Sequence, residues 1–106
     1  MDKKVYTIAD FRKILEKVID DKLENTGDGF DVLNTMQQMS DEELLKAKLY
    51  ADLGLDSIDV MQTITLFEAF NDVSIMDEAE NALGTGVSLT VEKFLDIIST
   101  YQESYD

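Results

Sequence analysis

The chain of 106 residues contains no histidine, no cysteine, no proline and no tryptophan. Without histidine or cysteine it cannot form a Ser–His–Asp triad or a Cys–His catalytic pair. The same two absences exclude disulfides, thiol redox chemistry and zinc sites with the usual nitrogen and sulfur ligands. Several familiar catalytic and metal-binding classes are therefore excluded before any pattern is considered.

Long apolar runs are also lacking, since none exceeds the three residues Leu49, Tyr50 and Ala51. We therefore expect no membrane span. Residues 1–5 lack the apolar core of a signal peptide, so we expect a cytoplasmic protein. With 44% apolar and 30% charged residues, the chain suits one small domain over residues 1–106. We expect that domain to be a monomer.

Basic residues are scarce and unevenly placed. Nine Lys and Arg stand against 23 Asp and Glu, which gives a net charge of −14. Between Lys48 and Lys93 there are nine acidic residues and no basic one. Such a field repels nucleic acid and anionic membranes and attracts basic protein surfaces. We therefore expect protein partners and no nucleic acid, although an acidic surface that serves only solubility has the same composition.

Helical periodicity begins early in the chain. A near-capping box at Thr7 and Asp10, followed by apolar residues on one face, predicts a first long helix over residues 7–24. Phe30, Leu33, Met36 and Met39 recur every three residues and predict a short or 3₁₀-like helix. The capping box that opens at Ser40 predicts another short helix.

The second half of the chain predicts two more long helices, over residues 57–70 and after Thr90, with one brief helix near Asp77. No segment alternates as a strand does. We therefore predict an all-α fold, a small four-helix bundle of three long helices and one short. An extended connection separates its first two long helices.

The helix over residues 57–70 is unusual, because apolar residues surround its whole circumference: Ile58, Val60, Met61, Ile64, Leu66, Phe67 and Phe70. A helix of this kind is either central or buries a second side against a partner or ligand. It follows the turn Asp52-Leu53-Gly54-Leu55-Asp56, in which Gly54 permits a positive φ angle.

Ser57 stands at the start of this helix, and three features indicate a functional role. A phosphate ester on Ser57 would lie where the helix dipole and unsatisfied backbone N–H groups favour an anion. The helix behind it has apolar surface to spare for a cargo, and a basic enzyme could approach a region without positive charge. The simpler interpretation is that Ser57 or Asp56 is only a helix cap.

Other motifs fail. If Gly29 occupied the sixth position of a calcium loop, Thr35 would stand at the twelfth, where a bidentate Glu is required. No metal site is therefore predicted. Gly84-Thr85-Gly86 lacks the second half of a phosphate-binding loop and is interpreted as a hinge. No nucleophile has an evident base, so we expect a protein that is not an enzyme.

The segment Leu53-Gly54-Leu55-Asp56-Ser57-Ile58 resembles the attachment motif of the acyl carrier proteins, Leu-Gly-x followed by Asp-Ser-Leu or Asp-Ser-Ile. The order of predicted elements is similar to that family over nearly the whole chain. The resemblance implies a bundle of acyl-carrier type in which Ser57 receives 4′-phosphopantetheine from coenzyme A. The thiol of that arm would hold acyl groups as thioesters.

The resemblance also implies roles for other residues. Asp56, Ile58, Asp59 and Glu68 would be recognised by the phosphopantetheinyl transferase and by acyl-loading and acyl-transferring enzymes with basic surfaces, with Asp59 and Glu68 on an acidic face. A second set would line either an acyl groove or simply the core: Met61, Ile64, Phe67 and Ile75. The implied function is to shuttle acyl intermediates in fatty-acid, lipid or polyketide-type biosynthesis.

Some residues depart from the family pattern. Gln62, Thr63, Thr65 and Ala69 stand on a helix surface that is often richer in Glu, and the segment before Ser57 is about a dozen residues longer than usual. We therefore expect a specialised carrier. Two alternatives remain: an aminoacyl or D-alanyl carrier with the same arm, or an acidic helical interaction module in which Ser57 is only a cap.

Overall fold

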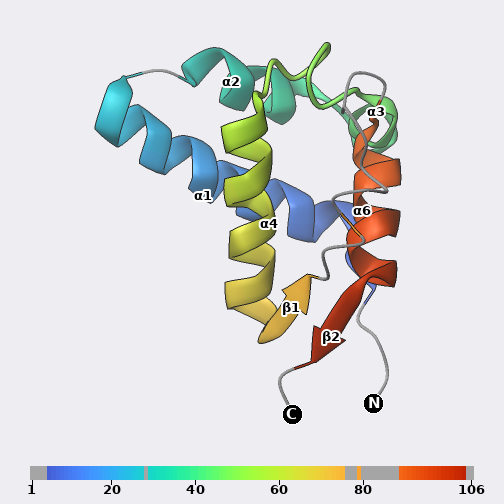
Figure 1. Ribbon diagram of the computed structural model, residues 1–106. Coiled ribbons are helices and arrows are strands. Elements are labelled where there is room, and N and C mark those ends of the chain that lie inside the picture. The colour runs from blue at the N-terminus through green and yellow to red at the C-terminus, as the bar shows by residue number, and fades with distance from the viewer. Residues whose placement is uncertain (1–4, 28, 76–78, 80–88, 105–106) are drawn as a thin grey trace.

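The computed structural model describes residues 5–27, 29–75, 79 and 89–104 and is mostly helical (Figure 1). Helix α1 (Ile8–Thr26) begins at the predicted capping box. The Thr7 hydroxyl accepts a hydrogen bond from the backbone N–H of Asp10, whose carboxylate accepts one from the Thr7 N–H. The helix ends at Gly27, which adopts the left-handed conformation. The first predicted helix is thus confirmed.

The expected long connection between the first two long helices is itself largely helical. Helix α2 (Phe30–Gln38) is a regular α-helix rather than a 3₁₀-like one. Helix α3 (Asp41–Lys46) begins at the predicted capping box, in which Ser40 and Glu43 exchange hydrogen bonds. Short helices were expected here, and both are present.

Arg12 of α1 forms hydrogen bonds and an ion pair with the connection between α1 and α4. Its guanidinium donates hydrogen bonds to the backbone carbonyls of Met36 at 3.0 Å and Met39 at 2.6 Å, at the carboxyl end of α2. It also pairs with the Asp41 carboxylate of α3 at 2.9 Å. One side chain therefore satisfies carbonyls that the end of α2 leaves without helical partners.

The two remaining long helices are α4 (Ser57–Asn71) and α6 (Val91–Thr100). Both lie against α1 in Figure 1, and α6 also packs against α3. Helix α6 begins where predicted, with the Thr90 hydroxyl accepting a hydrogen bond from the Lys93 N–H. The brief helix expected near Asp77 falls outside the described residues.

A small sheet was not expected. Strand β1 (Val73–Ile75) pairs antiparallel with β2 (Gln102–Ser104), and Ser74 stands opposite Glu103. The mostly helical fold agrees with the all-α prediction, but the expectation that no segment forms a strand is wrong. Three residues are too few for an alternating pattern to stand out from the sequence around them.

The N-terminal segment closes the same end of the molecule. The Tyr6 hydroxyl donates a hydrogen bond to Gln102 Oε1 at 2.8 Å, and the Tyr6 N–H donates to the Ser99 hydroxyl at 3.1 Å. Burial raises the pKa of Tyr6. Its ring centroid lies 4.9 Å from that of Phe67, inside the aromatic core that Phe11 and Phe94 complete.

The molecule is compact, with a Cα radius of gyration of 13.2 Å. No helix in the described part of the chain has both the length and the apolar character needed to cross a membrane.

Candidate functional site

The turn of residues 52–56, called here the Gly54 turn, is anchored on both sides. Leu53 and Leu55 are buried, and the Leu55 N–H donates a hydrogen bond to the Leu49 carbonyl at 3.0 Å. Between them Gly54 has a φ of +74°, as predicted. A Cβ added at Gly54 would meet no atom within 4 Å, so the backbone angle rather than space favours glycine here.

Asp56 is the cap of α4, and Ser57 is its first helical residue. Asp56 Oδ1 accepts a hydrogen bond from the Asp59 N–H at 2.8 Å, while Asp59 Oδ2 accepts one from the Asp56 N–H at 3.2 Å. Ser57 is exposed, and its hydroxyl has no hydrogen-bond partner among the residues that the structure describes. The capping role therefore belongs to Asp56, and Ser57 is presented to solvent.

The negatively charged carboxylate of Asp56 already lies at the amino end of α4. The hydrogen bond from the Asp59 N–H is the main reason that the pKa of Asp56 is lowered; the Lys22 charge and the Ile58 N–H lower it further. The expectation that unsatisfied N–H groups would attract a phosphate on Ser57 is therefore only partly right. Some of those groups are taken by Asp56, and the helix dipole remains.

A cation that the sequence analysis missed lies at this end of α4. Lys22 Nζ of α1 is 3.0 Å from Asp59 Oδ2 and 3.9 Å from Asp56 Oδ2. The signal was present, because a helical wheel places Lys22 between Phe11 and Leu15, inside the apolar stripe of α1. A charged residue in such a stripe needs a buried partner.

Two of the expected recognition residues, Asp59 and Glu68, interact with other residues of the fold. Asp59 is only 2% exposed and pairs with Lys22, so the expectation that it lies on an acidic face is wrong. Glu68 is half-buried, and its carboxylate accepts a hydrogen bond from the Ile75 N–H at 2.8 Å. Asp56 and Ile58 are exposed on either side of Ser57, as recognition by an enzyme would require.

The four candidate groove residues are separated by burial. Phe67 is fully buried and contacts the rings of Tyr6 and Phe94, so it belongs to the core. Ile64 and Ile75 are half-buried at the margin of the core. Met61 is exposed on the outer face of α4.

The exposed residues of that outer face are uncharged, and the half-buried Glu68 borders them. Ile58 is 64% exposed and Met61 61% exposed, and the exposed residues beside them are Gln62, Thr65 and Ala69. Thr63, which was grouped with this surface, is buried and donates a hydrogen bond to the Asp59 carbonyl at 2.7 Å. In a chain of net charge −14, an uncharged helix face is a distinctive surface.

An open pocket, called here the α2 pocket, borders the Gly54 turn. Its volume is about 530 Å³, and its walls come from the end of α1, the first half of α2 and residues 51–54. Its side chains mix charged, polar and apolar types, including Lys22, Asp31, Asp52, Phe30, Thr35 and Leu53.

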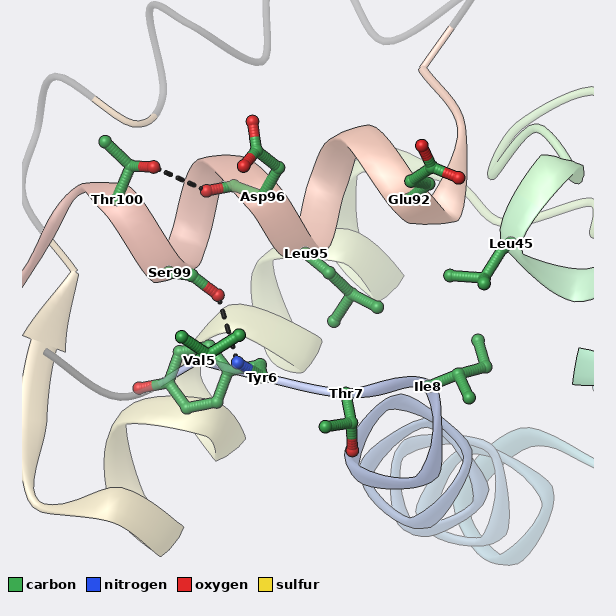
Figure 2. Close-up of a pocket in the computed structure, with 10 residues that line it drawn as sticks. All are labelled: Val5, Tyr6, Thr7, Ile8, Leu45, Glu92, Leu95, Asp96, Ser99 and Thr100. Atoms are coloured by element: carbon green, nitrogen blue, oxygen red, sulfur yellow. Dashed lines mark hydrogen bonds between the residues drawn. The ribbon is translucent and has the colours of Figure 1, made fainter. Parts of the chain in front are cut away.

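Two other spaces lie elsewhere. Figure 2 shows a pocket of about 580 Å³ between the N-terminal segment and α6, with Leu45 of α3 at one side. A space too small to admit a water molecule lies under α4 among core residues such as Val60 and Phe94. Within the described ranges, no three acidic side chains gather closely enough to hold a metal ion.

Comparison of the chain with family models, with curated proteins and with solved structures gives no match. The motif around Ser57 and the geometry of this site are therefore the features that bear on function.

Proposed function

We propose that this chain is a carrier protein, not itself an enzyme, whose Ser57 is the attachment site of 4′-phosphopantetheine. Its bundle would be of acyl-carrier type, with α1, α4 and α6 as the three long helices. The observation that carries the proposal is the presentation of Ser57. An exposed hydroxyl without a hydrogen-bond partner in the described residues follows a turn that two buried leucines and a capping aspartate hold in place.

The surroundings of Ser57 fit the group. The Ser57 oxygen would form a phosphodiester with the pantetheine phosphate of coenzyme A, displacing adenosine 3′,5′-bisphosphate and releasing its proton to a base of the transferase. Lys22 supplies the nearby positive charge, and the amino end of α4 adds its dipole. When bound, the arm supplies a thiol that holds cargo as a thioester.

The proposed partners are a phosphopantetheinyl transferase and enzymes that load and remove the cargo. Asp56 and Ile58 flank Ser57 at the surface and are placed to contact them. The acidic field would steer basic enzymes toward the carrier, whereas the uncharged outer face of α4 would make apolar contacts at close range. Tethering raises the effective concentration of the cargo at each active site.

The proposal is tested by incubating the full chain with coenzyme A and a broad-specificity phosphopantetheinyl transferase, followed by intact-mass analysis. We expect the wild type to gain one phosphopantetheinyl group and Ser57→Ala to gain none. Because Ser57 is exposed, circular dichroism should show that the variant is folded. Peptide mapping of the modified wild type should place the group on Ser57.

Two results would redirect the proposal. No mass gain with several transferases would favour the interaction module, in which the Gly54 turn only starts α4. If the wild type is modified, the cargo is tested next by loading acyl chains of increasing length. Each CH₂ buried in an apolar site should stabilise the fold by about 0.8 kcal/mol. A melting temperature that does not change with the length of the acyl chain would favour an aminoacyl or D-alanyl unit.

A further inference from the structure

We propose that the α2 pocket is the resting site of the prosthetic arm. The inference depends on the proposed attachment to Ser57 and assigns a role to the long segment between α1 and α4. Residues of α2 and the Gly54 turn line the same pocket, and Ser57 begins α4 three residues after Gly54. The pocket is built from that segment and from the Gly54 turn.

The pocket is within reach of a group on Ser57. Gly54 lies on its wall, three residues before Ser57, and three residues span at most about 11 Å even when fully extended. Lys22 lies on the same wall and contacts the carboxylates of Asp56 and Asp59, which flank Ser57 in sequence. Lys22 therefore belongs both to the wall of the pocket and to the amino end of α4.

A positively charged side chain also lies on the side of Ser57 that faces the α2 pocket. The residues between Lys48 and Lys93 include no cation, so positive charge near Ser57 must come from another part of the chain. Lys22 brings it from α1, at the wall of the pocket, where it is paired with the carboxylates of Asp59 and Asp56 and where the wall also carries Asp31 and Asp52. The exposed residues of the outer face of α4, which an arm would follow in the other direction, include no cation, and the half-buried Glu68 borders them.

The wall matches the chemistry of the arm. Pantetheine alternates polar groups, which are a hydroxyl and two amides, with apolar ones, above all a pair of geminal methyl groups. The pocket offers the exposed ring of Phe30 and the side chains of Val32 and Leu53 for the methyl groups. The Thr35 hydroxyl and the glycine backbones of the wall can bond the amides. Its volume of about 530 Å³ lies within the range of small-molecule sites.

The walls are held firmly. Gly29 has a φ of +115°, and a Cβ there would lie 3.0 Å from Ile19 Cγ2, so α2 starts in close contact with α1. The Arg12 hydrogen bonds to the Met36 and Met39 carbonyls hold the other end of α2. A site formed before its ligand arrives loses less entropy on binding.

The test compares the apo protein with fully converted holo protein. Isotope-labelled full-length chain is modified with unlabelled coenzyme A, and conversion is checked by intact mass. Filtered nuclear Overhauser spectra then report contacts between arm and protein. We expect contacts from the geminal methyl protons to the Phe30 ring, and amide shifts at Thr35, Ala51 and Gly54.

Phe30→Ala is the diagnostic variant, and Phe70→Ala is its matched control. Both rings are exposed, to 67% and 55%, and Phe70 lies against α1 beside Lys13 and Lys17, away from the Gly54 turn. In converted protein, Phe30→Ala should lose the pocket shifts and Phe70→Ala should keep them.

The outcomes separate the two proposals. Absence of mass gain on Ser57 would overturn the proposed function itself. Normal conversion without arm contacts in the α2 pocket would overturn only the resting site. Contacts confined to Ile58 and Met61 would also overturn it, because they would place the arm along the outer face of α4.

Discussion

Helices α4 and α6 are both rich in apolar residues, but they use them differently. All five apolar residues of α6 are buried: Val91, Phe94, Leu95, Ile97 and Ile98. In α4, Val60 and Phe67 are buried, whereas Ile58, Met61 and Phe70 are exposed. Helix α6 therefore has one apolar face, whereas α4 has two.

The difference separates stability from recognition. Apolar residues that α6 buries contribute to the free energy of folding in proportion to the area they remove from water. The exposed residues of α4 contribute little to that free energy. Ile58 and Met61 follow Ser57 on an uncharged surface, so they remain available to whatever approaches the serine. Four predictions test this division of labour, from the largest expected effect to the smallest.

The largest effect is expected from truncating a core ring of α6. Phe94→Ala should lower the free energy of unfolding by about 3–5 kcal/mol, because it leaves a cavity beside Phe11 and Phe67. Phe70→Ala removes the same ring from α4 and should change it by less than about 0.5 kcal/mol. Urea denaturation of both variants measures the contrast. Similar losses in the two would contradict the comparison.

Breaking the ion pair that holds the amino end of α4 comes second. Lys22→Met leaves the Asp59 carboxylate buried without its cation and should cost about 1–3 kcal/mol. Lys17→Met is the control, since the Lys17–Asp21 pair is exposed on α1 and should be worth about 0–0.5 kcal/mol. Denaturation at fixed pH compares them. Adding Asp59→Asn should restore part of the loss from Lys22→Met.

The stability that the caps of α4 and α6 contribute should depend on pH in different ways. Thr90→Ala and Asp56→Ala should each cost about 1 kcal/mol at neutral pH. The pKa of Asp56 is lowered by folding, so its added stability is present above the ordinary aspartate pKa of about 3.9 and is lost as pH falls through the lowered value.

The neutral variant Asp56→Asn isolates that charge. Asparagine also caps helices well, so its cost at neutral pH should be small. The stability difference between wild type and Asp56→Asn should shrink as the solution is acidified from pH 5 toward pH 2. Thr90→Ala should show no such trend. A constant difference for Asp56→Asn would contradict the assigned direction of the Asp56 pKa.

The smallest effect on stability is expected on the outer face of α4. Ile58→Ser and Met61→Ser should each change the free energy of unfolding by less than about 0.5 kcal/mol. If Ile58 is buried by the transferase, its replacement should slow arm attachment about tenfold or more, which corresponds to at least about 1.4 kcal/mol of lost contact. Thr65→Ser, on the same face, is the control. Unchanged attachment in both variants would remove this face from the recognition surface.

Local signals in the sequence predicted much of the fold. Capping boxes and apolar periodicity placed the starts of α1, α3 and α4, because these depend on residues a few positions apart. The Gly54 turn followed in the same way, whereas the choice between Asp56 and Ser57 as the cap of α4 needed the structure. The strand pair could not be predicted, since β1 and β2 are three residues each and meet only through the tertiary fold.

The electrostatics of the site needed the structure. The resemblance to the acyl carrier proteins placed Asp59 on an acidic face, yet it is buried against Lys22. Only the wheel position of Lys22, among apolar residues, hinted at such a pair. The α2 pocket depends on how α1, α2 and the Gly54 turn pack, and no pattern within one element reveals it.

The closure of the chain near Tyr6 has a practical consequence. Tyr6 and Gln102 meet beside Phe67, in the second half of α4, and α4 is about 22 Å long. Val5 and Ser104, the first and last residues that the structure describes, therefore lie near the end of α4 that is away from Ser57, where Figure 1 shows β2. A fusion partner, affinity tag or surface linker attached at either end would leave the serine facing outward. The molecule can thus be immobilised without hiding the hydroxyl that enzymes would need to reach.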